Sequence, residues 1–329
     1  MDFVSSFCLN NIPITELFLI SDIIMNRTLT IFTPAYNRAH TIGRTYESLC
    51  RQTCKDFEWL IIDDGSSDNT HELVEGWIRD NKIPIRYIYQ ENQGMHGAHN
   101  TAYKNIHTEL NTCIDSDDWM PDDAVDKIVN TWKKDGNPSL SGLVGLDIIE
   151  DGSVIGTKFP EDRKTIKVGK FYEEGGKGDK KLVYRTEIIN STPEYPIFEG
   201  ERYFGLAYKY LLVEEKYEML ALNHPLVVVE YQQDGSSYSM YRQYWNNPNG
   251  WMFYRKFEMS HTSLFFRKLK LSIHYVSSCI RANRIWDLLD NSQPFLTLML
   301  LPVGIAFYYY TRYKVTENQR MDFNKKINK

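Results

Sequence analysis

The chain has 329 residues, enough for one large domain or two smaller ones, and its composition is ordinary for a globular protein apart from abundant aromatic residues. The formal charge of −5 conceals an asymmetry, because residues 251–329 hold 13 Lys and Arg against 5 Asp and Glu, which leaves the first 250 residues acidic. Five cysteines without a framework spacing argue against a disulfide scaffold or a zinc site, and we expect reduced thiols of a cytosolic protein.

Residues 1–27 lack the basic start and cleavage site of a signal peptide. We expect an N-terminal extension, or sequence upstream of a start at Met25. From Leu29 onward, strand patterns alternate with helix patterns: strands at 29–32, 59–62, 85–88 and 110–114, helices at 41–52 and 70–79, and a loop at 90–99 that leads into a helix. This alternation predicts an α/β fold with a mostly parallel sheet, in which ligands bind beyond the carboxyl ends of the strands.

The most informative stretch is acidic. An apolar strand end runs into three carboxylates within four residues, at Asp115, Asp117 and Asp118. Carboxylates this close repel one another and are costly to bury unless a cation neutralises them. Mg²⁺ or Mn²⁺ suits such oxygen ligands, and Mg²⁺ is typically held by one or two carboxylates together with substrate phosphates. The alternative is an acidic turn that caps a helix beginning near Pro121.

Two further loops follow buried strands. In the first, Asp63-Asp64-Gly65-Ser66, a carboxylate can accept a hydrogen bond from a planar ring N–H such as that of uracil. In the second, Thr33-Pro34-Ala35-Tyr36-Asn37, backbone groups and an aromatic face can meet a base. Taken singly, each is more simply a turn or a helix cap. The absence of Gly-x-Gly-x-x-Gly after the first strand argues against a dinucleotide site, and a P-loop pattern is also absent.

In this order and spacing, the loops resemble those of the family 2 glycosyltransferases with the GT-A fold, a Rossmann-like sheet flanked by helices. Four stretches carry the resemblance: Thr33–Asn37, Asp63–Thr70, Asn92–Gly94 with Ala98–Asn100, and Asp115–Trp119. It is specific over residues 28–125 and extends in some form to 235, which we expect to end the catalytic domain. Such enzymes transfer a sugar from a nucleotide-sugar donor with inversion at the anomeric carbon.

The resemblance implies roles for the matched residues. Asp115 and Asp117 would form the Asp-x-Asp motif that touches ribose and a Mn²⁺ or Mg²⁺ ion, with Asp118 as a further metal ligand. Glu201 is expected to be the general base and Glu199 the second choice, although many relatives have Glu-Asp there. The nucleotide-sugar would be bound by Thr33, Pro34, Tyr36, Asp64, Asn92, Gly94, Asn100, Asp115, Ser116 and Asp117.

The middle of the chain is less regular. Strands are expected at 143–149 and 226–231, a flexible loop at 175–179, and a helix that Glu199-Gly200-Glu201 opens and that reaches Leu212. His96 and His99, in the loop over the site, are candidates for phosphate contact, and Trp119 is a candidate for stacking on a sugar. Each of these three has an ordinary structural role as its alternative. The polar, aromatic segment 231–244 is a candidate acceptor site or a surface loop.

Residues 236–329 are expected to form an acceptor-side and helical region associated with the membrane. The pattern is helical over 250–290, and the apolar segment 295–310 is interrupted by Pro302 and Gly304. This segment is shorter than the ~20 apolar residues that a spanning helix needs. We therefore predict that it lies in the cytoplasmic membrane interface, supported by the preceding basic residues. The alternative is a buried helix packed on the catalytic domain.

The sequence thus predicts an inverting, metal-dependent glycosyltransferase in cell-surface polysaccharide synthesis. It would move a sugar, from a UDP-sugar by preference, to a glycan or lipid-linked acceptor at the inner membrane face, with peripheral attachment and no nucleic-acid partner. Two alternatives stay open. A nucleotidyltransferase also uses Asp-x-Asp but is expected to open with a glycine-rich, basic phosphate loop. A non-catalytic, membrane-associated nucleotide- or sugar-binding module would bind donor without metal-dependent hydrolysis or transfer.

Overall fold

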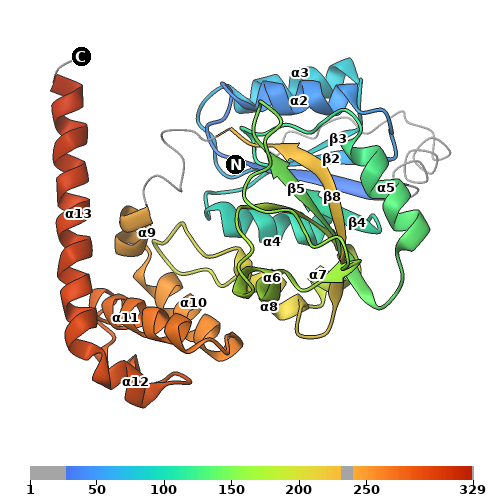
Figure 1. The fold of residues 1–329 in the computed structure, drawn as a ribbon. Coiled ribbons are helices and arrows are strands. Elements are labelled where there is room, and N and C mark those ends of the chain that lie inside the picture. Colours follow the sequence, from blue (N-terminus) through green and yellow to red (C-terminus); the bar gives the residue numbers. More distant parts are fainter. Residues whose placement is uncertain (1–26, 231–239, 328–329) are drawn as a thin grey trace, which may run out of the picture.

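The computed structural model describes residues 27–230 and 240–327, with side chains described as far as residue 317. They form an α/β body around one eight-stranded sheet, and a set of C-terminal helices lies beside it (Figure 1). The predicted α/β fold with a C-terminal helical region is confirmed. The N-terminal extension at 1–26 and most of the candidate acceptor segment, 231–239, lie outside the described residues.

The sheet has the strand order β3-β2-β1-β4-β7-β5-β8-β6. Strands β1 to β4 are parallel neighbours, β7 runs antiparallel to both β4 and β5, β5 and β8 are parallel, and β6 is an antiparallel edge. The strands are β1 Leu29–Ala35, β2 Phe57–Asp63, β3 Ile85–Tyr89, β4 Leu110–Cys113, β5 Leu140–Ile148, β6 Thr165–Ile166, β7 Lys180–Arg185 and β8 Glu218–Val228. The predicted strands are all present, whereas β6 and β7 were not expected.

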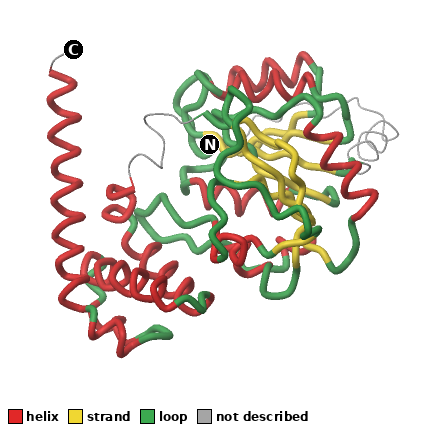
Figure 2. The backbone as a smooth tube through the Cα atoms, viewed as in Figure 1, coloured by secondary structure: helices red, strands yellow, loops and turns green. Residues whose placement is uncertain are grey.

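Helices cover both faces of the sheet, as Figure 2 shows by colour. Buried side chains of α2, α3 and α5 pack on one face, and those of α4 and α6 to α8 pack on the other. These helices are α2 Ile42–Arg51, α3 Thr70–Asp80, α4 Met95–Asn105, α5 Ala124–Asp135, α6 Val168–Glu173, α7 Thr186–Asn190 and α8 Ala207–Val213. Two expectations are wrong: α4 already begins at Met95, within the expected loop, and residues 199–206 are not helical.

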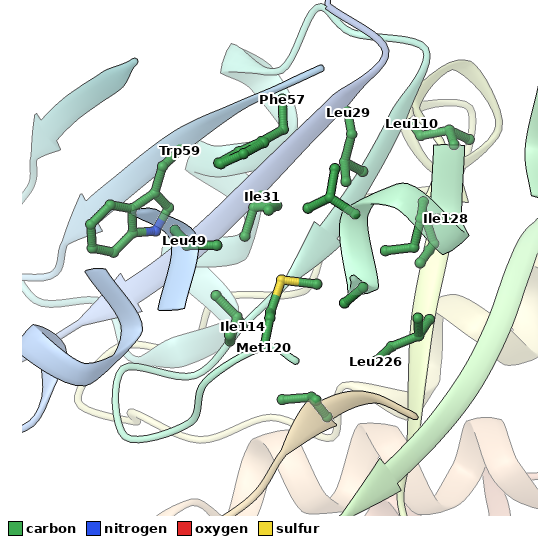
Figure 3. Packing of buried hydrophobic residues seen from close by; sticks show 14 of the residues in the cluster. Leu29, Ile31, Leu49, Phe57, Trp59, Leu110, Ile114, Met120, Ile128 and Leu226 are labelled. Atoms are coloured by element: carbon green, nitrogen blue, oxygen red, sulfur yellow. The ribbon is translucent and has the colours of Figure 1, made fainter. Parts of the chain in front are cut away.

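The core between the sheet and helices α2, α3 and α5 explains where the acidic stretch sits. Trp59 of β2 stacks on Tyr46 of α2. Figure 3 shows Trp59 with Ile31 of β1 and Leu49 of α2 in the same cluster. Ile114 and Met120, which bracket the acidic stretch, are both 1% exposed in this same cluster. Because burying each such side chain contributes about 1.5–3 kcal/mol, the acidic turn is fixed to the core at both of its ends.

The C-terminal helices are joined to the sheet through α10. Trp251 and Tyr254 of α10 belong to the core that α4 and α8 also line, while Met252 and Met259 pack against α11. The helical elements are α9 Met240–Asn246, α10 Pro248–His261, α11 Phe265–Arg281, the 3₁₀ helix η2 Ile285–Leu289, α12 Pro294–Met299 and α13 Leu301–Ile327. None of the helices within the described ranges is both long enough and apolar enough to span a bilayer.

The apolar segment 295–310 is not one helix. It is divided between α12 and α13, and part of its apolar surface is used inside the protein. Gly304 lies so close to Val276 of α11 that a Cβ there would collide with it, and the Phe307 ring lies 4.4 Å from the ring of His274. This face of α13 therefore packs on α11, away from the sheet. Its contact with a membrane stays a prediction.

Candidate functional site

The carboxyl ends of β2 and β4 flank the end of β1, and this brings the predicted loops together. The N–H of Asp64 donates to the carbonyl of Ala35 at 2.8 Å, and the N–H of Ile114 donates to the carbonyl of Phe32 at 2.9 Å. Tyr36, the residue that follows β1, is 51% exposed. Strand β1 lies between β2 and β4, the strands that lead into the two loops. The sheet therefore places the Asp64 loop and the acidic turn on either side of one strand end, as the sequence predicted.

Asp64 organises the loop that contains Gly94. Its carboxylate accepts hydrogen bonds from Gln90 Nε2 at 2.7 Å and from the N–H groups of Gln93 and Gly94, each at 2.8 Å. Burial raises the pKa of Asp64, although these hydrogen bonds and the nearby Arg202 oppose that rise. Asp64 thus fixes the shape of one wall of the candidate nucleotide site. Its remaining lone pairs can still accept a further hydrogen bond.

Gly94 joins this wall to the segment that carries the candidate bases. Its φ is +80°, and a Cβ would collide with the backbone carbonyl of Arg202. The next residue back, Glu201, is 4% exposed and its carboxylate holds the start of α10. Its Oε1 accepts from the N–H and Nδ2 of Asn249 at 2.8 Å each, and its Oε2 accepts from the N–H of Gly250 at 2.7 Å.

The expectation that Glu201 opens the following helix is therefore wrong. It caps α10 instead, whose first N–H groups have no partner within the helix and attract a carboxylate. Glu199, two residues earlier, is exposed, and no hydrogen bond or ion pair joins its side chain to the rest of the described chain. The catalytic roles of both residues stay predictions.

The acidic turn is compact and partly buried. The N–H of Asp118 donates to the carbonyl of Asp115 at 3.1 Å, and Asp118 Oδ1 accepts the N–H of Glu230 at 3.2 Å. Thr45 of α2 donates its hydroxyl to the Asp118 carbonyl at 2.7 Å. Burial, together with repulsion from Asp115 and Asp117, raises the pKa of Asp118 to about 8. The turn thus holds more negative charge than its surroundings stabilise.

Two charged residues of this site were missed by the sequence analysis. Lys181 of β7 donates its Nζ to the carbonyl of Cys113 at 3.0 Å, and although burial lowers the pKa of Lys181, Asp147 and Asp115 raise it more. Asp147, near the end of β5, is 4% exposed, and burial raises its pKa to about 6. Its Oδ1 finds no hydrogen-bond partner among the described residues. A lone Asp at the end of an apolar strand was the signal that could have revealed it.

The residues fit a divalent cation held jointly with a substrate. The carboxyl groups of Asp115, Asp117, Asp118 and Asp147 gather here, together with the positive charge of Lys181. Among residues 27–230 and 240–327, no three acidic, His or Cys side chains are grouped closely enough to hold a metal alone. Since Mg²⁺ commonly takes one or two carboxylates and completes its shell with phosphate oxygens and water, this arrangement suits a cation that arrives with a diphosphate.

Several expected ligand-binding side chains have structural tasks. Strand β1 extends through Thr33, which is fully buried and accepts a hydrogen bond from Trp59 Nε1 at 2.9 Å, so its side chain does not face a ligand. Asn100 donates to the carbonyl of Tyr195 and accepts from its N–H, both at 2.9 Å, and thereby ties α4 to the 195 segment. Tyr36, Asn92, Gly94 and Ser116 do lie in the loops around the site, whereas Pro34 is part of strand β1 and pairs with Ile62 of β2.

The two histidines are in α4, so the expectation that they lie in a loop over the site is wrong. His96 is 1% exposed, and the ring of His99 meets Phe32 edge to face at 4.9 Å. Burial lowers the pKa of His96 to about 4 and that of His99 to about 3. Both are neutral core residues near neutral pH. Trp119 meets the guanidinium of Arg44 at 4.8 Å from its ring centroid, so that cation occupies one of its faces.

Comparison with known proteins agrees with this arrangement. Residues 30–188 match the glycosyl transferase family 2, and this range includes Asp64, the acidic turn and Asp147. The chain carries a family 2 glycosyltransferase domain. The site lies within this domain, and the resemblance seen in the sequence is confirmed over residues 30–188.

Curated relatives of this domain carry different names. Chondroitin synthase of Escherichia coli is 33% identical over 127 residues, which are 39% of this chain but only 18% of that protein. The UDP-Glc:alpha-D-GlcNAc-diphosphoundecaprenol beta-1,3-glucosyltransferase WfgD of Escherichia coli is 28% identical over 211 residues, or 64% of this chain and 79% of that protein. The chain thus spans a small part of the first relative and most of the second.

Solved structures share the fold. TarS residues 1–349 of S. aureus, in complex with UDP-GlcNAc, give a TM-score of 0.53 at 18% identity and cover 85% of this chain and 79% of that one. The mannosyltransferase PcManGT of Pyrobaculum calidifontis, in complex with GDP-Man and Mn²⁺, gives 0.52 at 14% identity and covers 92% and 90%. Both confirm the GT-A-like α/β architecture.

Proposed function

We propose that this glycosyltransferase moves a sugar from a UDP-sugar, with inversion and with the help of Mn²⁺ or Mg²⁺, to a glycan or lipid-linked acceptor. One observation carries the proposal: the Asp64 loop, the acidic turn and the Glu199–Glu201 segment meet around the end of β1 and Gly94. Within this one arrangement lie candidate groups for binding the nucleotide, for holding the diphosphate and for acting as the general base. The TarS structure in complex with UDP-GlcNAc and the similarity to chondroitin synthase support the choice of donor and product.

The nucleotide would lie against the Asp64 loop, with Tyr36 as the exposed aromatic surface. Asp115 and Asp117 would hold the cation together with the diphosphate, and Asp118 would be a further ligand. When bound, the cation supplies positive charge that stabilises the departing nucleoside diphosphate. Lys181 adds a fixed positive charge on the same side, and Asp147 is placed to accept a hydrogen bond from a hydroxyl, because one of its buried oxygens has none among the described residues.

A carboxylate of the Glu199–Glu201 segment would take the proton of the acceptor hydroxyl as that hydroxyl attacks the anomeric carbon. Glu201 was the first choice from sequence, but both of its oxygens already accept hydrogen bonds from α10. We therefore place Glu199 first for proton transfer, and assign Glu201 the task of holding the segment against α10.

We propose that the acceptor is lipid-linked. The relative WfgD is named for an acceptor on diphosphoundecaprenol, and it matches 64% of this chain. Synthesis of a cell-surface glycan from such an acceptor would take place at the cytoplasmic face of the membrane, where this protein would be peripherally bound.

Release of UDP tests the proposal. The purified chain is incubated with each of a panel of UDP-sugars and, as controls, GDP-sugars, with Mn²⁺ or with a chelator. We expect UDP release from one UDP-sugar, in the presence of Mn²⁺ only. A protein that is stabilised by UDP-sugars but never releases UDP would be a binding module, and one that binds no nucleotide sugar at all would overturn the proposal.

A further inference from the structure

The segment from η2 to α12 exposes several large apolar side chains to solvent, where they do not contribute to the folded core. Trp286 is 94% exposed, Phe295 87% and Met299 70%, and three further apolar residues nearby are also exposed: Ile285, Leu289 and Leu298. Contiguous apolar surface of this kind on a folded protein marks a site of contact with a membrane or another protein. Figure 1 shows α12 at the lower end of the helical region, away from the sheet.

This segment is folded, so the exposure is not that of a loose tail. Leu288, only 5% exposed, is buried in the cluster formed by α10 and α11. The hydroxyl of Tyr275 on α11 donates to the carbonyls of Asp287 at 2.6 Å and Asp290 at 3.2 Å. Thr297 of α12 is fully buried and donates its hydroxyl to the carbonyl of Gln293 at 2.9 Å. One side of the segment is therefore pinned to α11, and the apolar side chains point to the other.

The charges of the segment are already neutralised. Arg284 pairs with Asp287 at 2.5 Å, and Asp290 pairs with Lys256 of α10 at 2.6 Å. No other charged residue occurs between 284 and 300. The segment can enter an apolar environment without carrying an uncompensated charge into it, which would be costly.

The charge of the surrounding region indicates which kind of surface this segment contacts. Residues 251–317, whose side chains the structure describes, hold 9 Lys and Arg against 4 acidic residues, a surplus that attracts anionic lipid and repels other cationic surfaces, including a second copy of the same region. A protein partner would also need about one hydrogen bond for every 100–200 Å² of interface, whereas the exposed side chains here are almost all hydrocarbon. Aromatic and apolar side chains backed by basic residues are typical of helices that lie in a lipid interface.

We propose that the segment 285–299, which we name the apolar tip, inserts into the headgroup and acyl boundary of an anionic bilayer. Trp286, Leu289, Phe295 and Met299 make the contact, while the face of α13 that carries Gly304 and Phe307 packs on α11. The proposal deepens the peripheral membrane binding of the proposed function, and rests on that function only for the reason why the protein would need a membrane. The apolar tip is the anchoring element.

Vesicle co-sedimentation of the full chain tests this, with vesicles of phosphatidylcholine alone or with phosphatidylglycerol added. The double variant Trp286→Ser with Phe295→Ser removes two apolar contacts without adding charge. A matched control is Ile78→Ser, which alters an exposed apolar residue of α3, far from the tip in sequence. We expect wild type and control to bind anionic vesicles and the double variant to bind at least about tenfold more weakly.

A second measurement locates the contact. Lipids brominated near the headgroup should quench the tryptophan fluorescence of wild type more than that of Trp286→Phe, because the six tryptophans that remain in that variant lie outside the apolar tip. Equal vesicle binding by wild type and the double variant, absence of binding by wild type, or equal quenching in both proteins would each overturn the proposal. So would a wild-type dimer in light scattering that the double variant abolishes, since the tip would then bind a second copy.

UDP release measured without vesicles separates this result from the proposed function. All variants should release UDP at the wild-type rate, because the tip is remote from the sheet edge. If wild type binds vesicles but releases no UDP, the proposed reaction fails and the apolar tip stands.

Discussion

Replacing Glu201 by Gln should lower stability first, and activity as a consequence. The carboxylate accepts three hydrogen bonds from the start of α10, at 2.7 to 2.8 Å. Glutamine keeps one oxygen for Asn249 but presents an NH₂ group to the N–H of Gly250, so two donors face each other. Since a hydrogen bond to a charged group contributes about 1.5–3 kcal/mol and a carboxylate at a helix N-terminus about 0.3–2 kcal/mol more, we expect a loss of about 2–4 kcal/mol.

Thermal unfolding followed by circular dichroism should then show a Tm lower by roughly 3–6 °C. The matched variant is Glu199→Gln, two residues away. It should leave the Tm within about 1 °C, because Glu199 is exposed, and should reduce turnover by ~10²–10⁴ if Glu199 is the general base. Turnover of both variants is read as UDP release at a temperature where each is folded.

The opposite pattern would refute this reasoning. If Glu201→Gln keeps the wild-type Tm and loses turnover while Glu199→Gln stays active, Glu201 is the base and its contacts with α10 are not what holds it. If both variants stay active, the base lies outside the 199–201 segment.

Three further predictions concern separate features. Asp117→Ala should abolish Mn²⁺-dependent UDP binding in calorimetry with an unchanged Tm, and equal affinity with and without chelator in wild type would contradict the metal site. Lys180→Met should cost about 2–4 kcal/mol in chemical denaturation, because the buried ammonium donates to the carbonyls of Ile155, Lys177, Gly178 and Asp179, whereas exposed Lys170→Met should be neutral. His274→Phe should reduce the stability lost between pH 7 and 5 by up to about 2 kcal/mol: burial lowers the native pKa of His274 to about 3, so the stability it contributes is complete above about pH 6.5 and declines as pH falls. If the variant and wild type lost the same free energy of unfolding between pH 7 and 5, that pKa would be contradicted.

The parts of the site that local sequence could predict are those built by consecutive residues. The acidic turn follows a strand and is bracketed by apolar Ile114 and Met120, so its position at the sheet edge could be inferred from a few neighbouring residues. The same holds for Asp64 after β2. The family resemblance rested on these loops, and it was confirmed over residues 30–188.

The parts that failed depend on residues far apart in the sequence. Thr33 was placed in the loop after the first strand, but pairing with β2 extends β1 to Ala35 and buries the Thr33 hydroxyl against Trp59. Glu201 was expected to open the next helix, yet its partners are at 249 and 250. Lys181 and Asp147 reach the acidic turn only because β7 runs antiparallel between β4 and β5. No local pattern contains such pairings.

The contact between Glu201 and α10 has a consequence for how the protein unfolds. Arg202 and Tyr203 also donate their N–H groups to Asn247 Oδ1, at 2.8 and 3.0 Å, and Trp251 and Tyr254 fill the core beneath the sheet. A chain cut at residue 235 would therefore lose partners on both sides of the cut. The sheet and helices α9 to α11 should melt as one cooperative unit, giving a single calorimetric transition, even though sequence and outline suggest two separate modules.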